Sequence, residues 1–135
     1  MANYTARARS NYFKVKNEAA FLAWAEKSKL EVWDDIRDGR KYFAICPDTE
    51  NGDWPTDRFN EEDDSFEELD VLLELSEHLD EASVAVLLEC GSEKLRYLSG
   101  WAMAINSKGE QEHILLFDIY EKAKHLGSEI TEAIY

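Results

Sequence analysis

Residues 48–81 carry fifteen carboxylates but only one basic side chain, Arg58, and this imbalance constrains the fold more than any other feature of the sequence. The whole chain has 29 acidic and 15 basic residues. The remaining residues therefore hold fourteen of each kind, and the formal net charge of −14 comes entirely from this one segment. Because unpaired carboxylates lose their hydration when they are buried, the segment is expected to lie at the surface.

This charge limits the classes of partner. A strongly negative surface repels nucleic acid and anionic membranes and attracts basic proteins. We therefore expect a basic protein partner, with no direct nucleic-acid or membrane contact. No apolar run reaches the roughly 18 residues of a membrane span, and the start "MANYTARARSNYFKVK" lacks the apolar stretch of a signal peptide. We expect a cytoplasmic protein, acting in the host cytoplasm if a phage or plasmid encodes it. Cys46 and Cys90, both in apolar runs, are expected to be buried thiols.

The length and the 44% hydrophobic content suit a single domain over residues 1–135. Alternation predicts a strand over residues 5–16, and Asn17 can cap a helix over residues 18–28. The Asp38-Gly39 pair predicts a hairpin that joins strands over residues 30–36 and 41–46. Pro47 ends the second strand because it cannot donate to a ladder.

The middle of the chain contains the clearest helix pattern. After a loop over residues 47–64, Ser65 and Glu68 form a capping box, and the helix is expected to run to about Glu81. Six apolar residues fall on one broad face of this helix: Phe66, Leu69, Leu72, Leu73, Leu75 and Leu79.

The last third reads as strands followed by a short helix. Residues 83–90 read as a buried strand, and residues 94–106 and 110–117 as a hairpin that turns at Gly109. Asp118 can cap a helix over residues 119–126, which Gly127 ends in a left-handed conformation, and residues 128–135 read as a short strand. The first ninety residues thus have the βαββαβ order of a ferredoxin-like unit. We predict an α+β fold with one mainly antiparallel sheet and about three helices packed on it.

On the predicted Ser65 helix, five carboxylates recur at spacings of three and four residues. Such a stripe places one carboxylate about every 5 Å along the axis. Like charges at this spacing destabilise a helix, and no Lys or Arg occurs between Arg58 and Lys94 to offset them. The stripe comprises Glu67, Asp70, Glu74, Glu77 and Glu81, and Glu61, Glu62, Asp63 and Asp64 extend it beyond the helix start. We take these nine carboxylates as the candidate partner-binding residues.

Two aromatic residues in the loop complete the candidate site. Trp54 and Phe59 lie in a polar stretch beside Arg58. Trp54 either anchors the loop on the sheet or contacts a partner, where Trp and Arg often concentrate binding energy.

A compact acidic α+β domain with the stripe "EEDDSFEELDVLLELSEHLDE" resembles the DNA-mimic inhibitors of phages and mobile elements, which include anti-CRISPR and antirestriction proteins. The resemblance rests on size and charge and covers about a third of the chain. It implies a non-enzymatic inhibitor that occupies a basic, nucleic-acid-binding site of a bacterial defence complex. The rest of the chain is charge-balanced, whereas such mimics can be acidic over much more of their surface.

Other readings remain open at this point. An immunity protein or antitoxin that neutralises a basic nuclease would use the same physics, as would an acidic interaction domain, and charge runs often serve only solubility. We find no metal-ligand spacing, no glycine-rich phosphate cradle and no nucleophile motif, so we expect no enzyme activity, catalytic residue, metal or cofactor.

Overall fold

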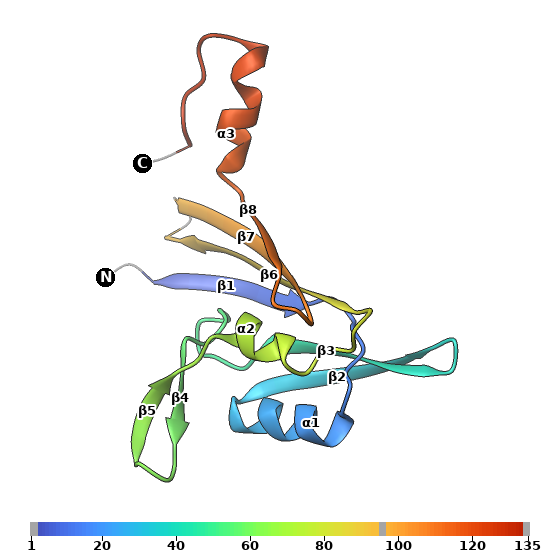
Figure 1. The fold of residues 1–135 in the computed structure, drawn as a ribbon. Helices are drawn as coiled ribbons and strands as arrows, with labels where there is room; N and C mark the ends of the chain where they lie inside the picture. Colours follow the sequence, from blue (N-terminus) through green and yellow to red (C-terminus); the bar gives the residue numbers. More distant parts are fainter. Residues whose placement is uncertain (1–2, 95–96, 134–135) are drawn as a thin grey trace.

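The computed structural model describes residues 3–94 and 97–133, and no helix in this part is long and apolar enough to span a membrane. The fold is α+β, as predicted. Its largest unit is an antiparallel sheet with the strand order β1-β6-β7-β8 (Figure 1). These strands are β1 (Tyr4–Ser10), β6 (Val84–Glu93), β7 (Tyr97–Asn106) and β8 (Gln111–Leu115).

The predicted hairpin at Asp38-Gly39 is confirmed. It joins β2 (Leu30–Arg37) to β3 (Arg40–Pro47), and both turn residues have positive φ, 52° at Asp38 and 76° at Gly39. This backbone twist matches that of the flanking strands.

The prediction of one sheet is wrong. The β2–β3 hairpin forms a two-stranded sheet of its own, and β1 neighbours β6 instead, so the ferredoxin-like order is not confirmed. The predicted strand over residues 5–16 ends at Ser10, whose buried hydroxyl accepts a hydrogen bond from the Ile45 N–H at 2.8 Å. Beyond it, Phe13 forms only an isolated bridge to Phe43. The chain thus leaves one sheet and crosses onto the other.

Helix α1 (Glu18–Lys27) confirms the Asn17 cap, because the side chain of Asn17 accepts a hydrogen bond from the Ala20 N–H at 3.0 Å. The helix covers the β2–β3 sheet in Figure 1 and buries Phe21 and Trp24 against it. The Phe21 ring lies 5.1 Å from that of Phe43, between centroids. The core therefore lies between α1, the β2–β3 sheet, the four-stranded sheet and the leucines of residues 69–79.

The predicted helix from Ser65 is wrong in its first part. Ser65 begins a strand, β5 (Ser65–Glu68), which pairs with β4 (Asp57–Asn60) inside the region expected to be a loop. The helix α2 is only Val71–Ser76, and its cap is Asp70, whose side chain accepts from the Leu73 N–H at 3.1 Å. Phe66 faces Phe59 across the hairpin, and this long-range pairing replaces the local capping box. Four of the six apolar residues are buried as expected, namely Leu69, Leu72, Leu75 and Leu79.

The C-terminal region also differs from its prediction. The helix is confirmed as α3 (Asp118–Lys122), continued by a 3-10 turn η1 (Ala123–Leu126). Asp118 does not cap it and instead accepts from the Leu115 N–H at 2.7 Å. Gly127 has a φ of 178°, so it continues the chain in an extended rather than a left-handed conformation. Residues 128–133 form no strand, and residues 134–135 of that prediction lie outside the described residues.

Candidate protein-binding surface

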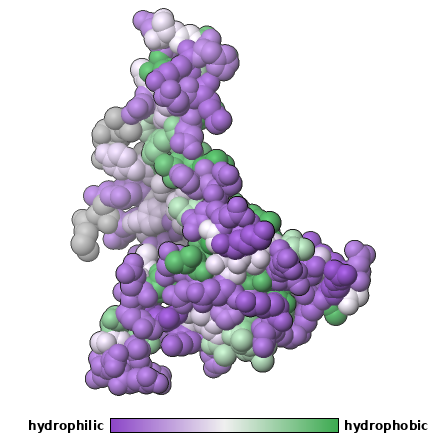
Figure 2. All heavy atoms as spheres, in the orientation of Figure 1, coloured by the Kyte–Doolittle hydropathy of each residue, from purple (hydrophilic) through white to green (hydrophobic). Residues whose placement is uncertain are grey.

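The β4–β5 hairpin carries four of the nine candidate carboxylates at its tip. Residues 61–64 form the turn between the two strands, and all four side chains are exposed. Asn60 organises the turn, because its side-chain oxygen accepts from the Glu62 N–H at 3.0 Å. The hairpin projects from the body in Figure 1, and Figure 2 shows hydrophilic atoms gathered at its end. The tip therefore presents four adjacent carboxylates, Glu61, Glu62, Asp63 and Asp64, to solvent.

These four carboxylates are not neutralised by the chain itself. None of them takes part in an ion pair within the described residues. Lys27, the last residue of α1, and Lys29 line a hollow of about 640 Å³ together with Glu61 and Glu62. No ion pair among the described residues joins these lysines to the tip, so they lower its negative potential without neutralising it.

Two further candidate carboxylates share one internal counter-charge, so the pair contributes one net negative charge instead of two. The guanidinium of Arg58 lies 2.7 Å from Glu67 and 2.6 Å from Glu74. The hydrogen bond from Arg58 holds the pKa of Glu67 below its ordinary value, and the two carboxylates together raise the pKa of Arg58. Arg58 also donates to the Ser28 hydroxyl at 3.2 Å, so it joins the hairpin to α2 and to the end of α1. These four residues, here called the Arg58 cluster, fix the base of the hairpin.

The remaining three carboxylates do not form the predicted stripe. Asp70 caps α2, Glu77 follows its last residue, and Glu81 lies in the turn before β6. A helix of six residues is too short to align Glu67 with Glu81. The row of carboxylates at regular intervals, on which the DNA-mimic resemblance rested, is therefore absent.

The two aromatic candidates, Trp54 and Phe59, differ in their exposure to solvent. Trp54 is only 7% exposed, and its indole N–H donates to the Leu88 carbonyl at 3.1 Å. The loop-anchor alternative is thus the one that holds, and Trp54 cannot contact a partner without leaving the core. Phe59 is partly exposed, and its ring lies 5.4 Å from that of Phe66, between centroids.

Phe66 was missed by the sequence reasoning, which placed it on the buried face of a helix. It is 69% exposed and lies beside the acidic turn. The signal that could have found it is the symmetry of Phe59 and Phe66 about residues 61–64, which matches antiparallel pairing. No Asn-Gly or Gly-Gly pair marks that turn, so the usual hairpin signature is missing.

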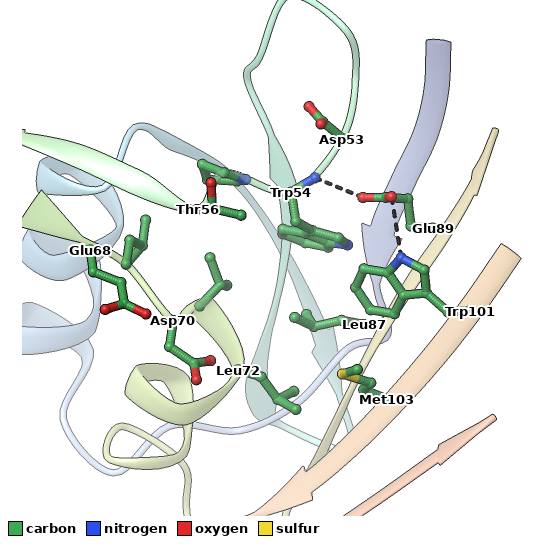
Figure 3. A pocket seen from close by; sticks show the side chains of 13 residues that line it. Asp53, Trp54, Thr56, Glu68, Asp70, Leu72, Leu87, Glu89, Trp101 and Met103 are labelled. Carbon is green, nitrogen blue, oxygen red and sulfur yellow. Dashed lines mark hydrogen bonds between the residues drawn. The ribbon is translucent and has the colours of Figure 1, made fainter. Parts of the chain in front are cut away.

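A cleft opens between the hairpin base, α2 and the large sheet (Figure 3), and it has a volume of about 450 Å³. Glu89 of β6 stands at one wall and accepts hydrogen bonds from the Trp54 main-chain N–H at 2.8 Å and the Trp101 indole at 3.2 Å. Its third donor is the Tyr4 hydroxyl at 2.9 Å. Both carboxylate oxygens of Glu89 thus accept hydrogen bonds from the protein itself, and these bonds anchor the loop of Trp54 to the sheet.

Among the described residues, no group of three or more His, Cys, Asp or Glu side chains could hold a metal ion. Both cysteines are free; Cys46 is buried as predicted, whereas Cys90 is exposed, so its prediction is wrong. The surface that stands out chemically is therefore the acidic, aromatic hairpin.

Comparison of the chain with protein-family models, with curated proteins and with solved structures finds no match.

Proposed function

We propose that this protein is a non-enzymatic inhibitor whose β4–β5 hairpin docks on a basic surface of a nucleic-acid-binding protein, as expected for a component that counters a bacterial defence system. The observation that carries the proposal is the group of four exposed, unpaired carboxylates at the tip of residues 57–68. Acting on such a partner, the protein would work in the cytoplasm.

The hairpin combines the features of a docking element. Its charges would steer a basic partner toward it and speed the encounter. Phe59 and Phe66 add an apolar anchor next to those charges, and aromatic residues often contribute most to binding at an interface. The Arg58 cluster holds the hairpin base in place, so little conformational entropy would be lost on binding.

The geometry favours a basic patch over the track of a DNA duplex as the complementary surface. A duplex carries one charge per ~1.7 Å along an extended axis. The hairpin instead offers a compact group of charges from one four-residue turn. The proposal therefore retains the basic partner implied by the sequence but does not require the regular row of charge.

The decisive experiment removes the tip charges and tests the same binding partner. Proteins captured from bacterial lysate at low salt would be identified, and the affinity of the purified partner measured by calorimetry. The test variant is Glu61→Gln, Glu62→Gln, Asp63→Asn and Asp64→Asn combined. We expect it to weaken binding about tenfold or more, mainly through slower association, and we expect added salt to weaken the wild-type complex similarly.

A control variant removes four exposed charges elsewhere and should leave the affinity unchanged. It combines Asp38→Asn, Glu112→Gln, Glu129→Gln and Glu132→Gln. Displacement of the captured protein by nucleic acid would support the proposed partner class. Equal effects of the two variants, or a captured protein that nucleic acid does not displace, would contradict the proposal.

A further inference from the structure

The C-terminal arm, residues 118–126, bears an apolar face that the rest of the described chain leaves largely exposed. The arm consists of α3 and η1, and none of its residues is fully buried. Ile119, Ala123 and Leu126 are spaced by four and three residues and so share one face. Ile119 is 57% exposed and Leu126 78% exposed. Figure 1 shows the arm standing away from the body, at the opposite end from the β4–β5 hairpin.

The chain's own tail reaches a different side of the arm. The Ala133 N–H donates to the Tyr120 hydroxyl at 2.7 Å, which ties residues 127–133 back along α3. Tyr120 in turn stacks on Phe117, with ring centroids 5.9 Å apart. Tyr120 follows Ile119 by one residue and therefore points about 100° away from it around the helix. The tail thus leaves the Ile119 face open.

That face continues into an apolar groove at the base of the arm. The groove has a volume of about 400 Å³ and lies between the arm and the adjacent strands β7 and β8. Figure 2 shows hydrophobic atoms gathered where the arm meets the body. The walls of the groove include Trp101, Ile114, Leu115, Leu116, Ile119 and Lys122. Contiguous exposed apolar surface on a folded protein is where partners often bind, and here the groove and the Ile119 face adjoin.

The charges of the arm indicate what would cover it. Its first turn carries acids, including Glu121, and its last turn carries bases, including Lys124. The charge of the arm therefore changes sign along its length, from negative at the first turn to positive at the last turn. A second arm placed antiparallel would set each acidic end against a basic end while the two apolar faces meet. The internal Glu121–Lys124 pair, 2.7 Å long, is exposed on both sides and is worth little by itself, so it does not oppose such pairing.

We propose that the arm and its groove form an isologous interface with a second copy of this chain, in which two arms pack antiparallel about a two-fold axis and each contributes Ile119, Ala123 and Leu126. A closed two-fold contact uses the same patch on both copies, which suits an apolar face flanked by self-complementary charge. The two acidic hairpins would lie at the far ends of the dimer, where at physiological salt their repulsion is screened. This inference is independent of the proposed function.

The first test measures the mass of the full-length protein by sedimentation velocity, from micromolar to submillimolar concentration at physiological salt. We expect a dimer that Leu126→Glu and Ile119→Glu each weaken about tenfold or more, with circular dichroism unchanged because both side chains are exposed. Ile36→Glu is the matched control: Ile36 is an equally exposed apolar residue, but it lies on β2, and this variant should still dimerise. A monomeric wild type, or a dimer that both arm variants leave intact, would overturn the proposal.

The second test reports the direction of packing. In a Cys90→Ser background, chains with Ile119→Cys and chains with Leu126→Cys are oxidised separately and then as a mixture. Antiparallel arms should give a disulfide-linked dimer in the mixture and little in either separate sample. Cross-linking in the separate samples that is as strong as in the mixture, or stronger, would mean parallel arms, which contradicts the proposed antiparallel geometry.

Discussion

The guanidinium of Arg58 lies 2.6 Å from the carboxylate of Glu74, and this ion pair connects the β4–β5 hairpin to α2. The Arg58 side chain is 14% exposed and that of Glu74 25% exposed, so solvent only partly screens their attraction. The indole of Trp24 donates to the same Glu74 oxygen at 3.0 Å. Arg58, the one basic residue of the acidic segment 48–81, therefore holds two of its carboxylates in place.

Replacing Arg58 should destabilise the fold and loosen the hairpin. Arg58→Ala leaves Glu67 and Glu74 close together without a counter-charge, and we expect a loss of roughly 2 kcal/mol in the free energy of unfolding. Arg58→Lys, which keeps the charge but loses one hydrogen-bonding arm, should cost less. Urea titration measures both effects. Arg7→Ala, at an exposed position on β1, should change stability little; a loss as large as that of Arg58→Ala would contradict the specific role of the pair.

Removing the carboxylate of Glu89 should release the Trp54 loop. Glu89→Ala leaves the Trp54 main-chain N–H, the Trp101 indole and the Tyr4 hydroxyl without their acceptor, with an expected cost of about 2 kcal/mol. Glu89→Gln keeps one good acceptor oxygen and should cost less. Tryptophan fluorescence during urea unfolding reports the change; identical midpoints for wild type and Glu89→Ala would show that the network contributes nothing.

The fold should lose stability on mild acidification because of His78. Its ring lies 5.2 Å from Trp24 and 6.3 Å from Phe21, between centroids. Burial lowers the pKa of His78 below 6.5, and Lys16 acts in the same direction, whereas the acids Glu77 and Glu74 oppose it. The unfolded chain therefore binds a proton first as the pH falls, so this contribution is fully present above about pH 6.5 and declines below it.

His78→Leu tests this expectation. The difference in urea midpoint between about pH 7.5 and about pH 5.5 should be smaller in the variant than in the wild type, because the variant lacks the titrating group. Equal pH dependence in the two proteins would exclude His78 as its source.

Gly52→Ala should be more damaging than Gly39→Ala. Both glycines have positive φ, 84° and 76° respectively, which costs a non-glycine residue about 1 kcal/mol. A Cβ at Gly52 would also collide with the main-chain carbonyl of Ala6, whereas nothing lies near Gly39. Thermal unfolding of the two variants should show the larger loss at Gly52. Equal losses would mean that the loop shifts freely away from β1.

The two thiols should differ in reactivity. Burial, with the Glu31 carboxylate accepting from the thiol at 3.4 Å, raises the pKa of Cys46 to about 11. Little thiolate then exists at neutral pH, and thiolate is the reactive species. An Ellman-type reagent should label exposed Cys90 first and Cys46 only upon unfolding. A Cys90→Ser protein that still reacts rapidly while folded would contradict this order.

The features predicted correctly are those that neighbouring residues decide. Asn17 caps α1 through a hydrogen bond to a residue three positions on, and Asp38-Gly39 turns the hairpin through its own backbone angles. The prediction at Ser65 failed because its local capping box competed with cross-strand pairing of Phe66 to Phe59. That pairing brings together residues on opposite sides of a turn with no glycine signature.

The sequence by itself determined the amount of negative charge, its confinement to residues 48–81 and the need for it to stay near water. Only the tertiary structure decided which carboxylates remain free. Arg58 reaches Glu74 sixteen residues away, and Glu89 holds Trp54 across thirty-five, so these contacts depend on how sheets and helix pack and not on spacing along one helix. Charge is a property of composition, whereas its neutralisation depends on distances of a few ångströms that only packing sets.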